Sequence, residues 1–204
     1  MNISQAVVHL VDDDFAIRDS LEMLIQSNGY SVSSYPSAYS FLEKFNLSQP
    51  GCLVLDVRMP NMNGLELQEE LLEKGINIPI IFISGNADIQ DSSKAFRAGA
   101  LDFLEKPFNH HVLIERIDEA IKQDVDSRFQ ITEKSQVKAH LESLTSREKE
   151  VLKLIVNGHT NKEVAKKLNI SYRTVDAHRA RVMQKMHTDS IATLVSLIAK
   201  HGLF

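Results

Sequence analysis

The sequence predicts two domains of different fold class: an α/β domain with a doubly wound, five-stranded parallel sheet, followed by a smaller all-α domain. Three observations in the 204 residues lead to this prediction. Short apolar runs alternate with stretches of helical period as far as residue 122. Only helical patterns follow residue 144, and the net charge changes sign between the two parts.

Five apolar runs are the predicted strands. Most of them lack a polar residue at every second position, so we expect strands that are buried on both faces, as in a parallel sheet with helices on either side. The runs cover residues 7–11, 31–35, 52–55, 78–83 and 101–104.

The segments between these runs carry apolar residues three and four positions apart, which places them on one face of a helix. We expect these helices to cover the sheet. The apolar stripes are Ile17, Leu21, Leu24 and Ile25; Leu67, Leu71 and Leu72; and Leu113, Ile117, Ala120 and Ile121.

Residues 123–142 are polar, with few large apolar side chains. We expect a linker here and leave open whether part of it is helical. The predicted domains are therefore residues 1–122 and residues 143–204.

Four short helices are expected in the C-terminal part. Two of them begin with the pattern Thr-x-x-Glu, in which each of the two side chains accepts a hydrogen bond from a backbone N–H of the first turn. These pairs are Thr145 with Glu148 and Thr160 with Glu163, and the helices are expected over residues 146–157, 161–168, 172–186 and 190–200.

Composition and charge narrow the class of protein. A content of 43% hydrophobic and 25% charged residues excludes collagen-like and disordered chains. The first 122 residues hold 9 Lys and Arg against 18 Asp and Glu, whereas residues 143–204 hold 11 against 5, so we expect a polyanionic partner for the basic part. No apolar run reaches the roughly 18 residues of a membrane span, and the single Cys52 can form no internal disulfide, so we expect a cytoplasmic protein without membrane contact.

Acidic residues follow two of the predicted strands. Asp12, Asp13 and Asp14 come after the first strand, and Asp56 ends the third. With the strand order 2-1-3-4-5, these two strands are neighbours, and ligands bind outside their carboxyl ends. Carboxylates gathered there suit Mg²⁺. The alternative is that the Asp residues only cap the helices that follow.

Further polar residues end the fourth and fifth predicted strands. Ser84 ends the fourth, and Lys106, followed by Pro107, ends the fifth. An ammonium group at this edge can neutralise a phosphoryl group, and a hydroxyl can donate a hydrogen bond to it. Taken singly, Ser84 reads as a loop hydroxyl and Lys106 as a solvated side chain, but beside the carboxylates they indicate phosphoryl chemistry.

Four motifs resemble, in order and spacing, the receiver domain of bacterial two-component response regulators: LVDDD at 10–14, LDVRMPNMNGLEL at 55–67, ISG at 83–85 and DFLEKPF at 102–108. The resemblance implies a flavodoxin-like fold, a sensor histidine kinase as phosphodonor, and Asp56 as phosphoacceptor. It also implies that Mg²⁺ is held by Asp12, Asp13, Asp56 and the backbone carbonyl of Arg58, and that the phosphate-binding and switch residues are Ser84, Phe103, Lys106 and Pro107. Pro107 is a candidate for a cis peptide bond.

Residues 161–180 have the pattern of a helix-turn-helix beside basic residues, which favours DNA binding over a helical bundle with a cationic face. Helical spacing places Val175, His178, Val182 and Met186 toward the core, with His178 packed and hydrogen-bonded. Arg179 is ambiguous between a DNA phosphate and an acid. The predicted base-facing residues are Arg173, Asp176, Ala177, Ala180 and Gln184, and the predicted phosphate-facing residues are Asn161, Lys162, Thr174, Arg181 and Lys185.

This part, with LTSREKEVL at 144–152, resembles the LuxR-type DNA-binding domain, and the whole chain resembles the NarL/FixJ class of transcriptional regulators. The resemblance implies a homodimer on phosphorylation that binds paired half-sites of double-stranded DNA. Because Asp176 and two alanines face the bases, we expect an Asp–cytosine contact, thymine methyl contacts and DNA shape to carry sequence preference. Helical spacing places Ile191, Leu194, Val195 and Ile198 on one stripe of the last helix, and part of this stripe must cover the small core. The resemblance implies that the same stripe forms the dimer contact.

The leading hypothesis is a transcription factor that is switched by phosphorylation of Asp56 and is not a metabolic enzyme, although it can lose its phosphoryl group by autodephosphorylation. A second hypothesis, a Mg²⁺-dependent phosphohydrolase with an Asp nucleophile, needs a substrate-enclosing insertion, whereas the loops at the strand ends are short. A third is a DNA-binding protein that ignores phosphate and uses its first domain as a dimer scaffold.

Overall fold

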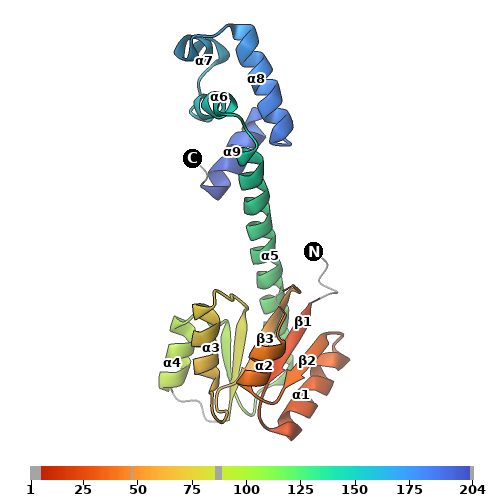
Figure 1. The fold of residues 1–204 in the computed structure, drawn as a ribbon. Helices are drawn as coiled ribbons and strands as arrows, with labels where there is room; N and C mark the ends of the chain where they lie inside the picture. Colours follow the sequence, from red (N-terminus) through yellow and green to blue (C-terminus); the bar gives the residue numbers. More distant parts are fainter. Residues whose placement is uncertain (1–5, 47, 86–88, 203–204) are drawn as a thin grey trace. The chain divides into compact units, whose positions relative to one another are not determined.

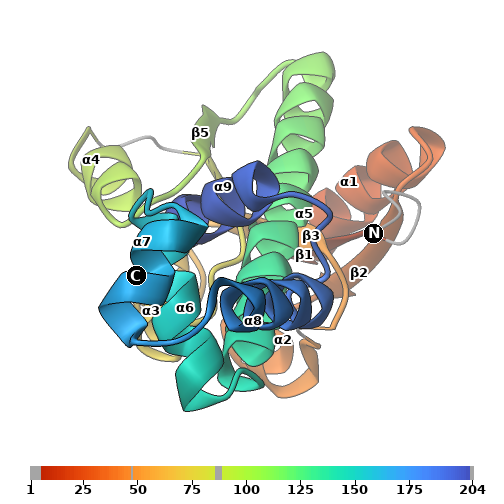
Figure 2. The same cartoon turned by 90° about the horizontal axis from the view of Figure 1, so that it is seen from above.

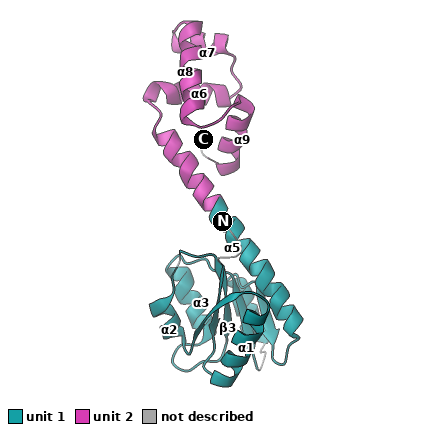
Figure 3. Ribbon diagram, turned by 90° about the vertical axis from the view of Figure 1, so that its right-hand side faces the viewer, with its two compact units in different colours: residues 1–129 teal, residues 130–204 magenta. Residues whose placement is uncertain are grey.

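The structure is a computed structural model that describes residues 6–46, 48–85 and 89–202. The chain divides into an N-terminal unit, residues 1–129, and a C-terminal unit, residues 130–204 (Figure 3). The outer ends of the predicted domains, residues 1 and 204, lie outside the described residues. In the described part of the chain, no helix combines the length and the apolar character that a membrane span requires.

The N-terminal unit contains a five-stranded, all-parallel sheet with the order β2-β1-β3-β4-β5, which confirms the predicted sheet and strand order. Strands β1 and β3 are neighbours, and Val11 lies opposite Leu55. Asp12 follows Val11 and Asp56 follows Leu55, so the two carboxylates emerge side by side. The strands are β1 (Val7–Val11), β2 (Ser31–Tyr35), β3 (Gly51–Asp56), β4 (Ile80–Ser84) and β5 (Asp102–Glu105).

Helices cover both faces of this sheet (Figure 1). Ile25 of α1 and Ile117 of α5 are buried against one face, and Phe41 of α2 and Leu67 of α3 are buried against the other. Leu72, predicted on the buried stripe of α3, is 46% exposed, since it lies one position past Leu71 and turns off the core face. The helices are α1 (Phe15–Ser27), α2 (Ala38–Lys44), α3 (Gly64–Glu73), α4 (Ile89–Arg97) and α5 (His110–Glu142).

The segment predicted as a polar linker, residues 123–142, is helical throughout, as the second part of α5. Two residues anchor it. The buried Asp124 carboxylate accepts hydrogen bonds from the Gly51 backbone N at 2.9 Å and from Arg128 Nε at 2.7 Å, both within the N-terminal unit. Val137 is buried in the core of the C-terminal unit. Asp124 and Val137 lie far apart along the helix and form no continuous apolar stripe. Because such a stripe is the sequence signal for a packed helix, the pattern indicated a linker.

The four helices predicted for the C-terminal unit are confirmed, and they follow α5 (Figure 2). Thr145 and Thr160 each form the predicted capping box, and Ser171 caps α8, the second helix of the predicted helix-turn-helix, through the backbone N of Thr174. The helices are α6 (Ser146–Val156), α7 (Asn161–Leu168), α8 (Tyr172–Lys185) and α9 (Ile191–His201).

Helix α9 supplies part of the core of this small unit. Leu194 and Ile198, predicted as dimer contacts, are 0% and 2% exposed and pack with Val137 and Met186. Leu194 and Ile198 are thus the part of the stripe that covers the core. Their assignment to the dimer contact is corrected, because side chains that fill the core of their own unit are not available to a partner. Among the predicted dimer residues, Ile191 and Val195 are half-buried.

Candidate functional site

Three charged side chains meet at the carboxyl ends of β1, β3 and β5. Lys106 Nζ donates hydrogen bonds to Asp12 Oδ2 at 2.9 Å and to Asp56 Oδ1 at 2.7 Å. Asp12 and Asp56 are only 1% and 6% exposed. The sheet order therefore brings together the carboxylates and the lysine that the sequence placed at one edge.

The second oxygen of each carboxylate accepts a hydrogen bond from the backbone. Asp14 N donates to Asp12 Oδ1 at 2.8 Å, and Arg58 N donates to Asp56 Oδ2 at 2.7 Å. Burial raises the pKa of Asp56 even though Lys106 opposes this shift. Burial also acts to lower the pKa of Lys106, but the hydrogen bonds and charges of the two carboxylates outweigh it and raise that pKa. Each carboxylate is thus held in one orientation beside a charged lysine.

Only glycine fits at position 64 beside Asp56. A Cβ atom there would lie 2.3 Å from the backbone carbonyl oxygen of Asp56 and 3.1 Å from the ring of Phe82. The Gly64 backbone N donates to the Val57 carbonyl oxygen at 2.9 Å, which ties the start of α3 to the loop after β3. This close approach fixes the backbone that carries Asp56.

The other predicted phosphate-site residues lie at the ends of β4 and β5. Ser84 is buried, and its carbonyl oxygen accepts a hydrogen bond from the Lys106 backbone N at 2.7 Å. The Phe103 ring is half-buried, with its centroid 6.1 Å from that of Phe82. The bond between Lys106 and Pro107 is cis, as the sequence suggested.

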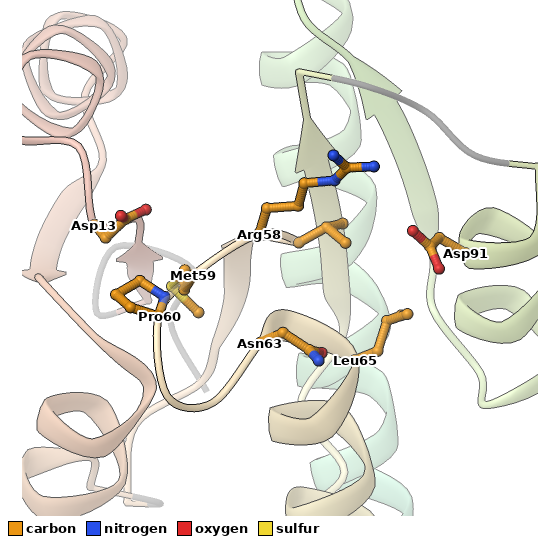
Figure 4. A pocket seen from close by; sticks show the side chains of 8 residues that line it. Asp13, Arg58, Met59, Pro60, Asn63, Leu65 and Asp91 are labelled. Carbon is orange, nitrogen blue, oxygen red and sulfur yellow. The ribbon is translucent and has the colours of Figure 1, made fainter.

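A cleft of about 480 Å³ is lined in part by residues 57–60, which directly follow β3. Asp13 and Asp91 flank it, and the Arg58 side chain extends between them (Figure 4). Asp13, predicted as a magnesium ligand, is exposed, whereas Asp12 and Asp56 are buried. Within the described ranges, no three His, Cys, Asp or Glu side chains converge closely enough to hold a metal ion. The oxygen donors of Asp12 and Asp56 nevertheless fit a hard cation such as Mg²⁺ in kind.

Helix α8 has one buried face and one exposed face, as its periodicity predicts. Val175, Val182 and Met186 are buried, whereas His178 is half-buried and its Nδ1 has no hydrogen-bond partner within the described residues. The predicted packing of His178 is confirmed, but no hydrogen bond of Nδ1 is found. The predicted base-facing residues are all exposed, namely Arg173, Asp176, Ala177, Ala180 and Gln184.

Lys185, predicted at DNA phosphates, forms an ion pair inside the unit instead. Its Nζ donates to Glu148 Oε2 at 2.7 Å and to the Ser143 carbonyl oxygen at 3.2 Å. Glu148 is 3% exposed, and the hydrogen bond from Lys185, followed by that from the Thr145 backbone, lowers its pKa to about 2. The prediction for Lys185 is corrected because its ammonium group is bound to Glu148. If Lys185 turned to a DNA phosphate, it would leave a buried carboxylate without a partner. Lys162, Thr174 and Arg181 are exposed, as their predicted role requires.

A polar network that the sequence did not predict joins α7 to α8. Asn161 Nδ2 donates to Asp176 Oδ1 at 2.5 Å, and Arg179 donates to Asn161 Oδ1. Arg179, left ambiguous above, is thus bound to Asn161. No spacing in a single helix shows this contact, because it depends on how α7 and α8 cross.

Comparisons with known proteins match both units. The model of the response regulator receiver domain matches residues 8–118, and the model of bacterial regulatory proteins of the luxR family matches residues 142–198. The chain is 45% identical over 195 residues to response regulator protein TodT of Pseudomonas putida, covering 96% of this chain and 86% of TodT. It is 41% identical to transcriptional regulatory protein FixJ of Rhizobium meliloti, covering 96% of each chain.

Solved structures give the same result. The structure of response regulator StyR is 40% identical, with a TM-score of 0.88, covering 96% of this chain and 99% of StyR. Full-length FixJ from B. japonicum is 35% identical, with a TM-score of 0.60, covering 97% of this chain and 98% of that one. The family consists of DNA-binding transcriptional regulators rather than metabolic enzymes. The chain therefore belongs to the two-component response regulators of the NarL/FixJ class, with a receiver domain followed by a LuxR-type helix-turn-helix domain.

Proposed function

We propose that a sensor histidine kinase phosphorylates Asp56 and that phosphorylation switches the binding of this transcriptional regulator to DNA. The observation that carries the proposal is the contact of Lys106 Nζ with both Asp12 and Asp56. The Asp56 carboxylate is the nucleophile, and Lys106 lies where it can neutralise charge on an incoming phosphoryl group. The arrangement also suits hydrolysis of the phosphoryl group by the protein itself.

Mg²⁺ is the cofactor of this proposal, held by Asp12, Asp13, Asp56 and the carbonyl oxygen of Arg58. When bound, it supplies positive charge that screens the carboxylates from the phosphoryl oxygens. The chain's own residues do the rest: the Arg58 backbone N–H orients Asp56, and Lys106 holds the nucleophile beside Asp12.

The phosphoryl group is proposed to act on a nearby surface. A phosphoryl oxygen accepts a hydrogen bond from the Ser84 hydroxyl and draws Ser84 inward. The Phe103 ring moves with Ser84, and the altered surface favours a homodimer. A dimer places two recognition helices on paired half-sites of double-stranded DNA. The proposed base-facing residues Arg173, Ala177, Ala180 and Gln184 are exposed for this role, as are the phosphate-facing residues Lys162, Thr174 and Arg181.

Incubation of the full chain with Mg²⁺ and acetyl phosphate, followed by intact-mass measurement, tests the first step. The expected product carries one added phosphoryl group, and Asp56→Ala removes this adduct. Sedimentation and DNA binding before and after treatment test the switch. An adduct that persists in Asp56→Ala, or DNA binding that is equal with and without the adduct, would contradict the proposal.

A further inference from the structure

The hydrogen bonds around Asn161 bear on what Asp176 does in DNA binding, and the inference below rests on the proposed function. Asn161 is the first residue of α7, and Asp176 and Arg179 lie one turn apart on α8. Asn161 Nδ2 donates to Asp176 Oδ1 at 2.5 Å, and Arg179 donates to Asn161 Oδ1. The amide therefore bridges a carboxylate and a guanidinium that belong to one helix.

This bridge fixes the amide in one orientation. A guanidinium only donates hydrogen bonds, and an ionised carboxylate only accepts them. If the amide were turned over, its nitrogen would face the guanidinium and its oxygen would face the carboxylate, so both hydrogen bonds would be lost. Asp176 and Arg179 together thus determine which atom of Asn161 faces which way.

We propose that Asp176 is a positioning residue that orients Asn161 toward a DNA phosphate, and that it does not read a base. An amide nitrogen carries two donor hydrogens, so the bond to Asp176 leaves a second one to donate. Asn161 also lies in the first turn of α7, where backbone N–H groups favour anions. Arg179 lies at the other end of the bridge, and its charge offsets the repulsion between the Asp176 carboxylate and the DNA.

This assignment changes the expected source of sequence preference. Under this assignment Asp176 orients Asn161 and does not accept from cytosine, so the Asp–cytosine contact expected from the sequence is not made. Direct readout then depends on Arg173 and Gln184, with methyl contacts from Ala177 and Ala180.

The test is selection of binding sites from a random duplex library with the acetyl phosphate-treated full chain, followed by affinity measurements on the selected duplex and its single-base variants. Asn161→Ala and Asp176→Ala are each expected to weaken binding roughly three- to tenfold on every duplex, as loss of one hydrogen bond would. The double variant, with both Asn161→Ala and Asp176→Ala, is expected to have an affinity no lower than that of the single variant that binds DNA more weakly. Asp176→Asn is expected to bind at least as well as the parent, because its amide oxygen still accepts from Asn161.

Asp189→Ala is the matched control. It removes another exposed carboxylate of the same unit and changes the net charge equally, so it isolates the bridge from the charge effect. Thermal unfolding of each variant confirms that it is folded at the assay temperature. A changed base preference in Asp176→Ala, a new preference for adenine in Asp176→Asn, or multiplied losses in the double variant would overturn the inference. A parent chain that selects no sequence at all would overturn the proposed function, and this inference with it.

Discussion

The two units of this chain both bury charged side chains, but they use them differently. In the N-terminal unit, the buried carboxylates Asp12 and Asp56 meet Lys106 at the edge of the sheet where phosphoryl chemistry is proposed. In the C-terminal unit, the buried carboxylate of Glu148 meets Lys185 between α6 and α8, away from the exposed face of the recognition helix.

The difference fits the chemistry that is proposed for each unit. A carboxylate that attacks phosphorus gains from a fixed, partly desolvated setting with a cation close by. A surface that binds DNA gains from exposed cations, because most of its affinity comes from phosphates that are themselves solvated. A buried ion pair is thus part of the proposed reactive site in one unit and part of the packed core in the other. The following predictions test this contrast.

The largest expected effect is that of Lys106→Met on phosphorylation. Removal of a positioned donor lowers the rate of such reactions about 100- to 1000-fold, so the rate of adduct formation from acetyl phosphate should fall by this order. A time course of intact mass measures the rate. Lys74→Met, which removes a cation from an exposed pair with Glu70, is the control and should leave the rate unchanged. A Lys106→Met chain that is phosphorylated as fast as the parent would show that this ion pair serves only the framework.

The next effect concerns α9. Leu194→Ala should lower the free energy of unfolding of the C-terminal unit by about 2 to 4 kcal/mol, because it opens a cavity in a small core. Urea denaturation followed by circular dichroism measures this change. Val195→Ala, at a half-buried position of the same helix, should cost about 1 kcal/mol or less. If Leu194→Ala kept its stability but lost dimerisation, the original assignment of Leu194 to the dimer contact would be restored.

Lys185→Met tests the framework pair by its pH dependence. The pKa of Glu148 falls from 4.5 to about 2 in the folded chain, so the pair stabilises the fold fully above pH 4.5 and progressively less as the pH falls toward 2. Without Lys185, the free energy of unfolding at neutral pH should drop by about 1 to 3 kcal/mol, and its slope in this acid window should flatten. Urea denaturation across the window measures both. A salt dependence of DNA binding that falls by about one unit in this variant would instead mark Lys185 as a phosphate ligand.

The smallest effect concerns the exposed cations of α8. Arg181→Ala should weaken binding to all duplexes by a similar factor and lower the slope of log affinity against log salt by about one unit. Arg173→Ala is the comparison, since it should also relax the preference at one base pair. Titrations of matched duplexes at several salt concentrations separate the two. A loss at a single base position in Arg181→Ala would move Arg181 to the base-facing set.

The sequence predicted what local pattern and chain order determine. Apolar runs predicted all five strands, and the order and spacing of Asp12, Asp56 and Lys106 predicted their meeting at one sheet edge. Helical periodicity predicted the buried and exposed faces of α8. These features depend on residues near in sequence or on a sheet topology with few alternatives.

The features that the sequence did not predict depend on contacts between elements. The pairing of Lys185 with Glu148 and of Asn161 with Asp176 requires the crossing of helices that the one-dimensional pattern does not contain. That Leu194 and Ile198 are the residues of the α9 stripe that cover the core was not predicted, because an apolar stripe shows that a face is covered, but not by what.

Helix α5 also determines where the chain can be divided without loss of contacts. One 33-residue helix carries Asp124, which anchors it in the first unit, and Val137, which fills the core of the second. A fragment that begins at residue 143 loses Val137 as well as the Glu133 carboxylate that binds Lys200 and His201 of α9. A division of the chain between Arg128 and Glu133 keeps the contacts of Asp124 and Arg128 in the first unit and those of Glu133 and Val137 in the second. The boundary between the two units therefore falls inside a helix rather than in a loop.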